Sequence, residues 1–148
     1  MKTIVVTGTP GTGKTLIAKK IAKQKGYVYI DVKRLIKNFR LNEKYDKKRK
    51  SWIVDIRKLN KLLISAIKVG EINHSKGIVF DSHLAHYLPN KYVNLCIVTR
   101  TEPKKLYARL KKRGYHKLKI GENMEAEIMQ VILEESHHLR HKIRVIWT

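Results

Sequence analysis

Short apolar runs alternate along the chain with stretches whose apolar residues recur at helical spacing. The first run, TIVVT at residues 3–7, is rich in β-branched residues, which is typical of a buried strand. Four later runs have the same character. The predicted strands are residues 3–7, 27–30, 78–80, 93–99 and 143–147.

The segments between these strands show the i, i+3, i+4 pattern of amphipathic helices. The clearest stripe predicts a helix that ends at Gly70, and its members are Leu59, Leu62, Leu63, Ala66 and Ile67. Three more helices are predicted. One ends at a Gly26 C-cap, one begins at Pro103, and one runs unbroken through residues 124–133.

This alternation predicts an α/β protein with a five-stranded parallel sheet and helices on both faces. The length of 148 residues suits one domain with a single core. Parallel sheets bind ligands at the carboxyl ends of their strands, where Gly8 and Asp81 fall. Two stretches, residues 33–50 and 100–119, each hold nine Lys and Arg residues, and we expect both to be mobile, solvent-facing insertions.

A phosphate-binding loop, G-x-x-x-x-G-K-T, follows the first predicted strand at residues 8–15. Its glycines let backbone N–H groups turn toward phosphate oxygens, and the next helix adds the positive end of its dipole. Lys14 would reach the β- and γ-phosphates, and the Thr15 hydroxyl would ligate Mg²⁺. An ordinary glycine turn is the alternative, but the strand–loop–helix context favours ATP with Mg²⁺.

An acidic residue, Asp81, follows the third predicted strand, where the partner of a phosphate loop usually lies. It would hold Mg²⁺ directly or through water. The alternative is a helix-capping or turn aspartate. His83 could orient an attacking water or acceptor near the γ-phosphate, although its spacing fits a structural loop histidine equally well.

Phosphoryl transfer also needs cations above the γ-phosphate. Arg109 and Arg113 are four residues apart and would share one side of a helix end, with Arg113 placed for a closing lid. A solvated charge is the alternative for either arginine. His137 and His141 would share a helical face, but without HExxH or a nearby cysteine we expect no zinc site there.

Composition adds one unusual feature, a formal net charge of +21. A nucleotide site needs few basic groups, so the excess favours contact with a second polyanion such as RNA. A lysine-rich solvated surface is the alternative. The single cysteine, Cys96, is predicted to be a buried thiol. The sequence has no leader-like start and no apolar run of about 18 residues, so we expect a cytoplasmic protein without membrane contact.

Five stretches of the sequence carry a family resemblance: TGTPGTGKT (7–15), YDKKRKSWIVDIRKL (45–59), IVFDSHLAHYLP (78–89), CIVTRTEPKKLYARLKKRGY (96–115) and ENMEAEIMQVILEES (122–136). They resemble the small adenylate-kinase-like proteins of the sixth isoenzyme type, which have archaeal members and a eukaryotic nuclear counterpart in ribosome maturation. Asp81-Ser82-His83 and the pattern around Arg109 and Arg113 are more specific than the phosphate loop alone.

This resemblance implies one P-loop domain over residues 1–148, with the three-layer nucleoside-monophosphate-kinase fold and with adenylate kinase and ATPase activities. It implies an AMP-binding segment at about residues 35–59 and a lid at about 113–123. Catalysis would fall to Lys14, Asp81, His83 and Arg113. ATP would be bound by Gly11, Gly13, Lys14, Thr15, the Leu16 backbone and Arg113, and Mg²⁺ by Thr15 and Asp81. The implied partner is a ribosomal protein of the small-subunit platform, with a role in rRNA maturation.

The sequence departs from the family pattern in two places. Relatives carry acidic residues in the AMP segment, where this chain has Lys47-Lys48-Arg49-Lys50. The basic run would hinder docking of a basic ribosomal protein, or it would touch rRNA directly. Relatives also continue into a terminal helix, whereas this sequence stops at Thr148. Either the helix is absent or the sequence is cut short, and absence of the helix would expose one flank of the sheet and invite self-association.

Three functions therefore stay open. One is an adenylate kinase that converts ATP and AMP to two ADP. Another is an ATP-driven ribosome-assembly factor that binds RNA or a ribosomal protein and has little AMP kinase activity. A kinase for another small acceptor is a third, because the sequence does not define a base-reading pocket.

Overall fold

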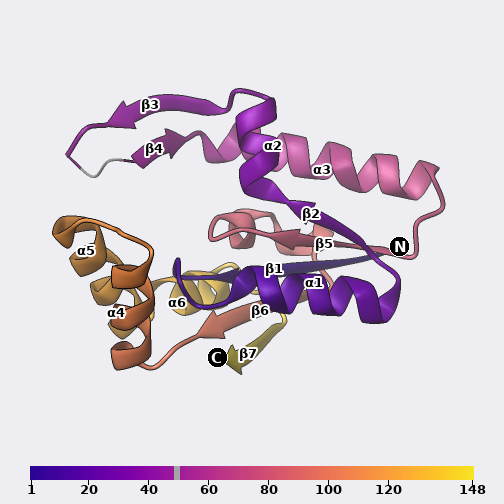
Figure 1. Ribbon diagram of the computed structural model, residues 1–148. Coiled ribbons are helices and arrows are strands. Elements are labelled where there is room, and N and C mark those ends of the chain that lie inside the picture. Colours follow the sequence, from indigo (N-terminus) through magenta and orange to yellow (C-terminus); the bar gives the residue numbers. More distant parts are fainter. Residues whose placement is uncertain (49–50) are drawn as a thin grey trace.

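The computed structural model describes residues 1–48 and 51–148, and it confirms the α/β architecture (Figure 1). All five predicted strands are present, within two residues of their predicted bounds. The elements in chain order are β1 (Lys2–Gly8), α1 (Lys14–Lys25), β2 (Val28–Asp31), α2 (Val32–Asn38), β3 (Asn42–Asp46), β4 (Ser51–Val54), α3 (Ile56–Ile72), β5 (Gly77–Asp81), the short 3₁₀ helices η1 (Ala85–Tyr87) and η2 (Asn90–Tyr92), β6 (Leu95–Arg100), α4 (Pro103–Lys112), α5 (Lys117–Ile128), α6 (Val131–His138) and β7 (Ile143–Trp147).

Five strands form one parallel sheet in the order β2-β5-β1-β6-β7. The central strand, β1, is apolar on both faces, and Val5 and Val6 are fully buried. In its register Val6 pairs with Asp81 of β5, and Gly8 pairs with Thr99 of β6. The carboxyl ends of three strands therefore meet at one edge of the sheet.

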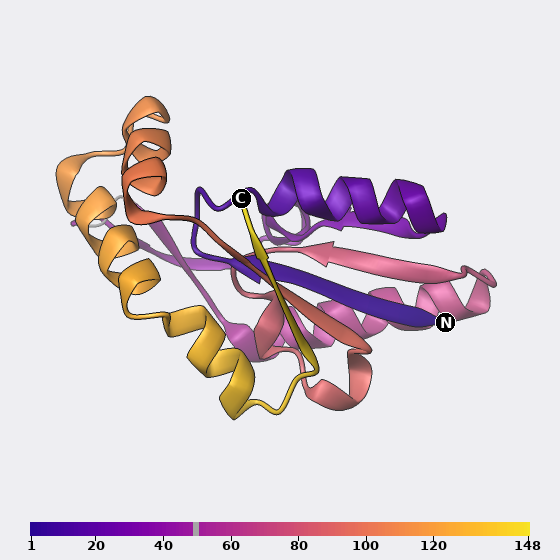
Figure 2. The same ribbon diagram turned by 90° about the horizontal axis from the view of Figure 1, so that it is seen from below.

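Helices cover both faces of this sheet, as Figure 2 shows with α1 on one side and α3 and α6 on the other. Ala18 and Ala22 of α1 pack with Val79 on the first face. On the second face Leu59 and Leu63 of α3 pack around Phe80 and Val98, with apolar residues of α2 and α6 against them. This three-layer arrangement is the predicted fold.

The sequence predicts helix ends at two glycines, and the structure confirms one of them. Gly26 caps α1 in the left-handed conformation, with φ 68°. Helix α3 instead continues through Gly70 to Ile72. A Cβ at Gly70 would lie 2.8 Å from the Met1 sulfur. Gly70 therefore lets the Met1 side chain pack closely against α3. The predicted helix end at Gly70 is wrong.

The long helix predicted over residues 124–133 is wrong, because α5 ends at Ile128 and α6 begins at Val131. Gln130, between them, adopts the left-handed conformation with φ 57°. Ile120 and Met124 of α5 pack with α4, whereas Ile132 and Leu133 of α6 pack on the sheet. One straight helix could not serve both surfaces, so the chain turns between them.

The two basic stretches are not simple solvent-facing insertions. Residues 100–119 include all of α4 and the start of α5, and Leu106 and Leu110 are fully buried in a small cluster with Ile120. Residues 33–50 include most of α2, where Ile36 is buried, and the strand β3. Arg49 and Lys50 lie outside the described residues. The lysine-rich composition concealed the few apolar anchors in each stretch.

Cys96 is buried in β6, as predicted. Its thiol contacts the Ser136 hydroxyl at 3.9 Å, and burial raises the pKa of the thiol to about 11. Such a thiol stays protonated and unreactive at neutral pH. Among the described helices, none is long and apolar enough to cross a membrane.

Candidate functional site

The phosphate loop joins β1 to α1 at the edge where the strand ends meet. Gly11 and Gly13 have φ values of 95° and 82°, which side chains rarely tolerate. A Cβ on Gly8 would collide with the Thr99 side chain of β6. The glycines are therefore needed for the conformation of the loop and for its close approach to the sheet.

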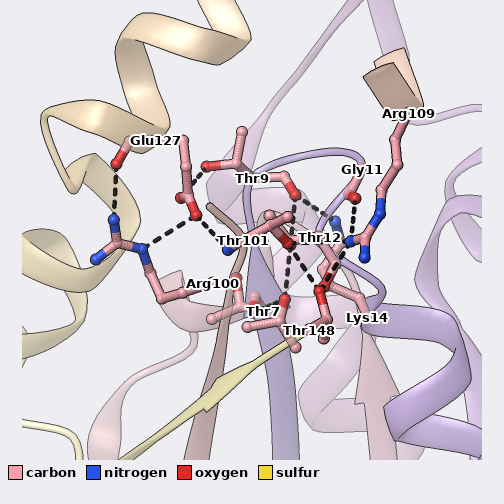
Figure 3. Close-up of polar contacts among 11 residues, drawn as sticks. Thr7, Thr9, Gly11, Thr12, Lys14, Arg100, Thr101, Arg109, Glu127 and Thr148 are labelled. Carbon is pink, nitrogen blue, oxygen red and sulfur yellow. Dashed lines mark hydrogen bonds and ion pairs between the residues drawn. The ribbon is translucent and has the colours of Figure 1, made fainter. Parts of the chain in front are cut away.

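Hydrogen bonds within the loop organise it around the carbonyl of Thr9 (Figure 3). That oxygen accepts the Thr12 hydroxyl at 2.6 Å and the Lys14 ammonium at 3.3 Å. The Thr12 hydroxyl also pairs with the Thr99 hydroxyl at 2.7 Å. The Lys14 side chain is thus folded back over the loop, where a phosphate group would compete for it.

The Lys14 side chain is half-buried, and its pKa lies below the ordinary value. Burial lowers the pKa of Lys14 to about 8, against the opposing effect of the Asp81 carboxylate. The charge of Arg113 lowers the pKa as well, and Glu127 raises it. A bound phosphate would keep the ammonium protonated, because an adjacent negative charge favours the charged form.

Asp81 ends β5 directly opposite the start of α1. It is buried, and its Oδ2 atom accepts the Thr15 hydroxyl at 2.7 Å and the Tyr29 hydroxyl at 2.8 Å. Thr15 and Asp81 thus supply adjacent hard oxygen ligands, which suit Mg²⁺. Among the described residues no group of three or more His, Cys, Asp and Glu is placed to hold a metal. Mg²⁺ needs no such group, since it takes few protein ligands beside phosphates and water.

His83 lies two residues beyond Asp81, and its side chain reaches solvent. Even so, the protein around it removes much of its hydration, which lowers the pKa of His83 well below its usual value. The positive charges of Lys14, Lys33 and Lys119 lower it further. His83 is therefore neutral at pH 7, and one ring nitrogen can accept a hydrogen bond.

Glu127 is a site residue that the sequence analysis missed (Figure 3). Its buried carboxylate accepts the Thr9 hydroxyl at 3.0 Å, the Thr101 backbone N–H at 2.8 Å and the Arg100 guanidinium at 3.1 Å. Its side chain thereby ties α5 to the phosphate loop and to β6. One signal was available, because Glu127 continues the apolar stripe of Ile120 and Met124, where an acid has no place unless it is paired.

Arg109 holds the other side of the loop. Its guanidinium donates to three oxygens, which are the Gly11 carbonyl at 3.2 Å and the hydroxyls of Thr101 at 3.1 Å and Thr148 at 2.9 Å. The Thr148 hydroxyl donates in turn to the Thr12 carbonyl at 3.0 Å. Arg109 therefore contacts the loop itself instead of pointing with Arg113 toward a ligand.

The remaining predicted residues lie around this loop. Arg113 caps the end of α4; its side chain is exposed but close enough to Lys14 to affect its charge. The Leu16 side chain is 76 % exposed on α1, so only its backbone could take part in phosphate binding. The structure thus brings Lys14 together with Thr15, Asp81 and Arg113 at one edge of the sheet, and His83 adjoins them.

A second polar cluster lies between β1 and α6. His86 is buried; its Nδ1 pairs with the Thr7 hydroxyl at 3.0 Å and its Nε2 with Glu135 at 2.8 Å. Burial lowers the pKa of His86, and Glu135 opposes that shift. His141 donates from Nε2 to the His86 carbonyl at 2.6 Å. Since α6 ends before His141, the helical face predicted for His137 and His141 is wrong.

Comparison with protein families gives a match over residues 4–130 to the family described as "AAA domain". A protein of Methanocaldococcus jannaschii named "Putative adenylate kinase" is 39% identical over 90% of this chain and 71% of its own length. The "Adenylate kinase isoenzyme 6 homolog" of Caenorhabditis elegans is 35% identical over the same shares of the two chains.

Solved kinase structures share the fold at much lower identity. Shikimate kinase from Acinetobacter baumannii in complex with shikimate aligns with a TM-score of 0.65 at 11% identity, over 100% of this chain and 84% of that one. Deoxyadenosine kinase from M. mycoides with bound dATP has a TM-score of 0.58 at 17% identity, over 99% and 90%. Identities this low support the fold and nothing finer.

Proposed function

Because the chain belongs both to the AAA domain family and to the family of the adenylate kinase isoenzyme 6 homologs, we propose that it transfers the γ-phosphoryl group of ATP to AMP. The observation that carries this proposal is the contact between Thr15 and Asp81, at 2.7 Å, beside Lys14. It supports a triphosphate and Mg²⁺ bound across the ends of β1 and β5.

In this proposal each site residue has one task. Backbone N–H groups from Gly11 to Leu16 bind the phosphates, and Lys14 and Arg113 stabilise charge on the transferring group. Thr15 and Asp81 hold Mg²⁺, directly or through water, and the ion neutralises phosphate charge when bound. The neutral imidazole of His83 orients the attacking oxygen.

The family resemblance is the basis for the acceptor side and for the lid. Residues from about 35 to 59 would bind AMP, and they comprise the end of α2, the β3–β4 hairpin and the start of α3, with Arg49 and Lys50 outside the described residues. Residues from about 113 to 123 would close over ATP as a lid. Both segments lie at the edge of the sheet that carries the phosphate loop (Figure 1).

The direct test is nucleotide turnover by the full chain with ATP, Mg²⁺ and increasing AMP, with ADP separated and quantified. We expect ADP formation to depend on AMP and to yield two ADP for each AMP consumed. The variant Lys14→Met should lose this activity, whereas Lys20→Met, which removes an exposed lysine of α1, should keep it. ADP formation that is the same with and without AMP at millimolar concentration would exclude AMP as the acceptor.

A second candidate function is ATP hydrolysis coupled to rRNA or to a platform ribosomal protein of the small subunit. The exposed lysines and arginines of α2, β3 and α4, on both sides of the phosphate loop, favour it. Water would then replace AMP at the same γ-phosphate. This role predicts ATP hydrolysis without AMP that rises when structured RNA is added at low salt. A hydrolysis rate indifferent to RNA and to the ribosomal protein would count against it.

A further inference from the structure

Tyr29 contacts the proposed metal site, and the proposed function gives it no task. Its hydroxyl, from β2, donates to Asp81 Oδ2 at 2.8 Å. The Thr15 hydroxyl, from α1, donates to the same oxygen at 2.7 Å. Two donors from different elements therefore hold one carboxylate oxygen.

The sheet register explains how Tyr29 reaches this carboxylate. Tyr29 pairs with Val79 of the neighbouring parallel strand β5. Side chains two apart on a strand face the same side and are about 7 Å apart, so Val79 and Asp81 share a face with Tyr29. A tyrosine side chain is long enough to span that step, and a shorter polar residue would not be.

Burial makes this contact consequential. Asp81 is 5 % exposed, so contacts with the protein govern its orientation more than water does. The Tyr29 hydroxyl is the donor in this contact, because a carboxylate oxygen can only accept. Lys19 of α1 lies with its ammonium 5.6 Å from the centre of the Tyr29 ring, which further restricts the ring.

We propose that Tyr29 is a positioning residue that orients the Asp81 carboxylate for Mg²⁺. This inference rests on the proposed function, since it requires Mg²⁺ to bind with ATP at Thr15 and Asp81. With Oδ2 held by two hydroxyls, Oδ1, which has no hydrogen-bond partner among the described residues, is left for the ion or for its water. Removing such an outer partner typically lowers metal affinity by 10- to 100-fold.

The variant Tyr29→Phe tests this role, because it removes the hydroxyl and keeps the ring. Isothermal titration calorimetry would give the dissociation constant of ATP for each protein in excess Mg²⁺ and in EDTA. We expect Tyr29→Phe to weaken ATP binding about tenfold in Mg²⁺ and less than twofold in EDTA. This split would not arise from a purely structural role.

Two reference variants make the result interpretable. Tyr27→Phe removes the same atom from a tyrosine that packs on Gly77, away from Asp81, and should leave both constants unchanged. Asp81→Asn should remove most of the gain from Mg²⁺. Thermal unfolding would confirm that each variant is folded.

Three outcomes would overturn the inference. Tyr29→Phe could leave both constants unchanged, or it could weaken ATP equally with and without Mg²⁺. In either case the role of Tyr29 fails while the proposed function stands. If wild-type protein gained no ATP affinity from Mg²⁺, the proposed function would fail first.

Discussion

Two arms flank the phosphate loop, and they differ in how they are joined to it. The arm of α4 and α5 is tied to the loop from both sides, by Arg109 to the Gly11 carbonyl and by Glu127 to the Thr9 hydroxyl. The arm of β3 and β4 is a hairpin whose described residues contact mainly each other. Figure 1 shows both arms projecting from the same end of the molecule.

This difference separates two tasks of the proposed site, which are to hold the triphosphate and to admit the acceptor. Contacts within the chain already set the geometry of the triphosphate side, so little ordering is needed there on binding. The hairpin arm has few such contacts and can change position at low cost. We therefore expect substitutions on the first arm to affect stability and ATP affinity together, and substitutions on the hairpin to affect only acceptor or polyanion binding.

The largest effect should come from Lys14. In Lys14→Met the loop loses the cation that would face the β- and γ-phosphates in the proposed function, and ADP formation should fall about 100- to 1,000-fold. The fold should remain, as circular dichroism would show, since within residues 1–48 and 51–148 the side chain makes one hydrogen bond, to the Thr9 carbonyl. Activity within tenfold of wild type would show that the phosphate loop does not take part in the reaction.

Glu127 should give the next largest effect, on stability. In Glu127→Ala the Arg100 guanidinium, whose side chain is 11% exposed, loses its carboxylate partner and keeps the bond to the backbone carbonyl of residue 127. We expect a loss of about 3 kcal/mol in the free energy of unfolding by urea, with weaker ATP binding.

The matched control for this prediction is Glu125→Ala, which removes an exposed acid from the same helix and should change stability by less than about 0.5 kcal/mol. Equal losses in the two variants would show that Glu127 does not tie this arm to the loop.

The charge of Lys14 should produce a smaller, pH-dependent effect. Its pKa is about 8 in the folded chain, below the ordinary 10.5, so the charged ammonium destabilises the folded state. Lys14→Met should thus be more stable than wild type by about 1–2 kcal/mol below pH 8, less than the full linkage because the group is half-buried.

Between pH 8 and 10.5 the unfolded wild-type chain binds more protons at Lys14 than the folded chain. Wild-type stability therefore rises with pH, and the advantage of the variant should shrink across that window. Urea unfolding of both proteins at pH 7, 9 and 10 would measure this difference in the free energy of unfolding. A constant difference would mean that the Lys14 pKa is not lowered.

The smallest effect on stability should come from the hairpin arm. Replacing Lys44, Lys47 and Lys48 by Gln changes exposed side chains, so the unfolding free energy should move by less than about 0.5 kcal/mol and ATP affinity should not move. Retention of RNA at low salt should fall, because about three cationic contacts are lost.

The control triple variant replaces Lys20, Lys23 and Lys25 of α1. It makes the same charge change on α1, which covers the other face of the sheet from α3 and α6. This variant should retain RNA as wild type does. If the two triple variants lose RNA equally, net charge and not the hairpin arm determines binding.

The parts predicted from sequence are those governed by local pattern. The strands follow from short β-branched runs, and the phosphate loop follows from glycines that the backbone conformation requires. Asp81 could be predicted because it follows a short apolar run, as the acidic partner of a phosphate loop usually does. The structure shows that this strand pairs with β1, so the two parallel strands end at a common edge.

What escaped prediction depends on contacts between distant segments. Glu127 meets Thr9 across 118 positions in the chain, and Tyr29 meets Asp81 across 52. The break at Gln130 has no glycine or proline to signal it, because it arises from two packing surfaces. The β3–β4 hairpin escaped because its lysines conceal the alternation of a strand pair.

The central place of β1 has a consequence for the nascent chain. β1 is made first, yet its neighbours in the sheet are β5 and β6, which begin at Gly77 and Leu95. At roughly 5–20 residues per second, β1 and its glycine loop wait several seconds on the ribosome before either neighbour exists. Through that interval an apolar strand stays unpaired, so the newborn chain is most prone to aggregate or to need a chaperone before its second half emerges.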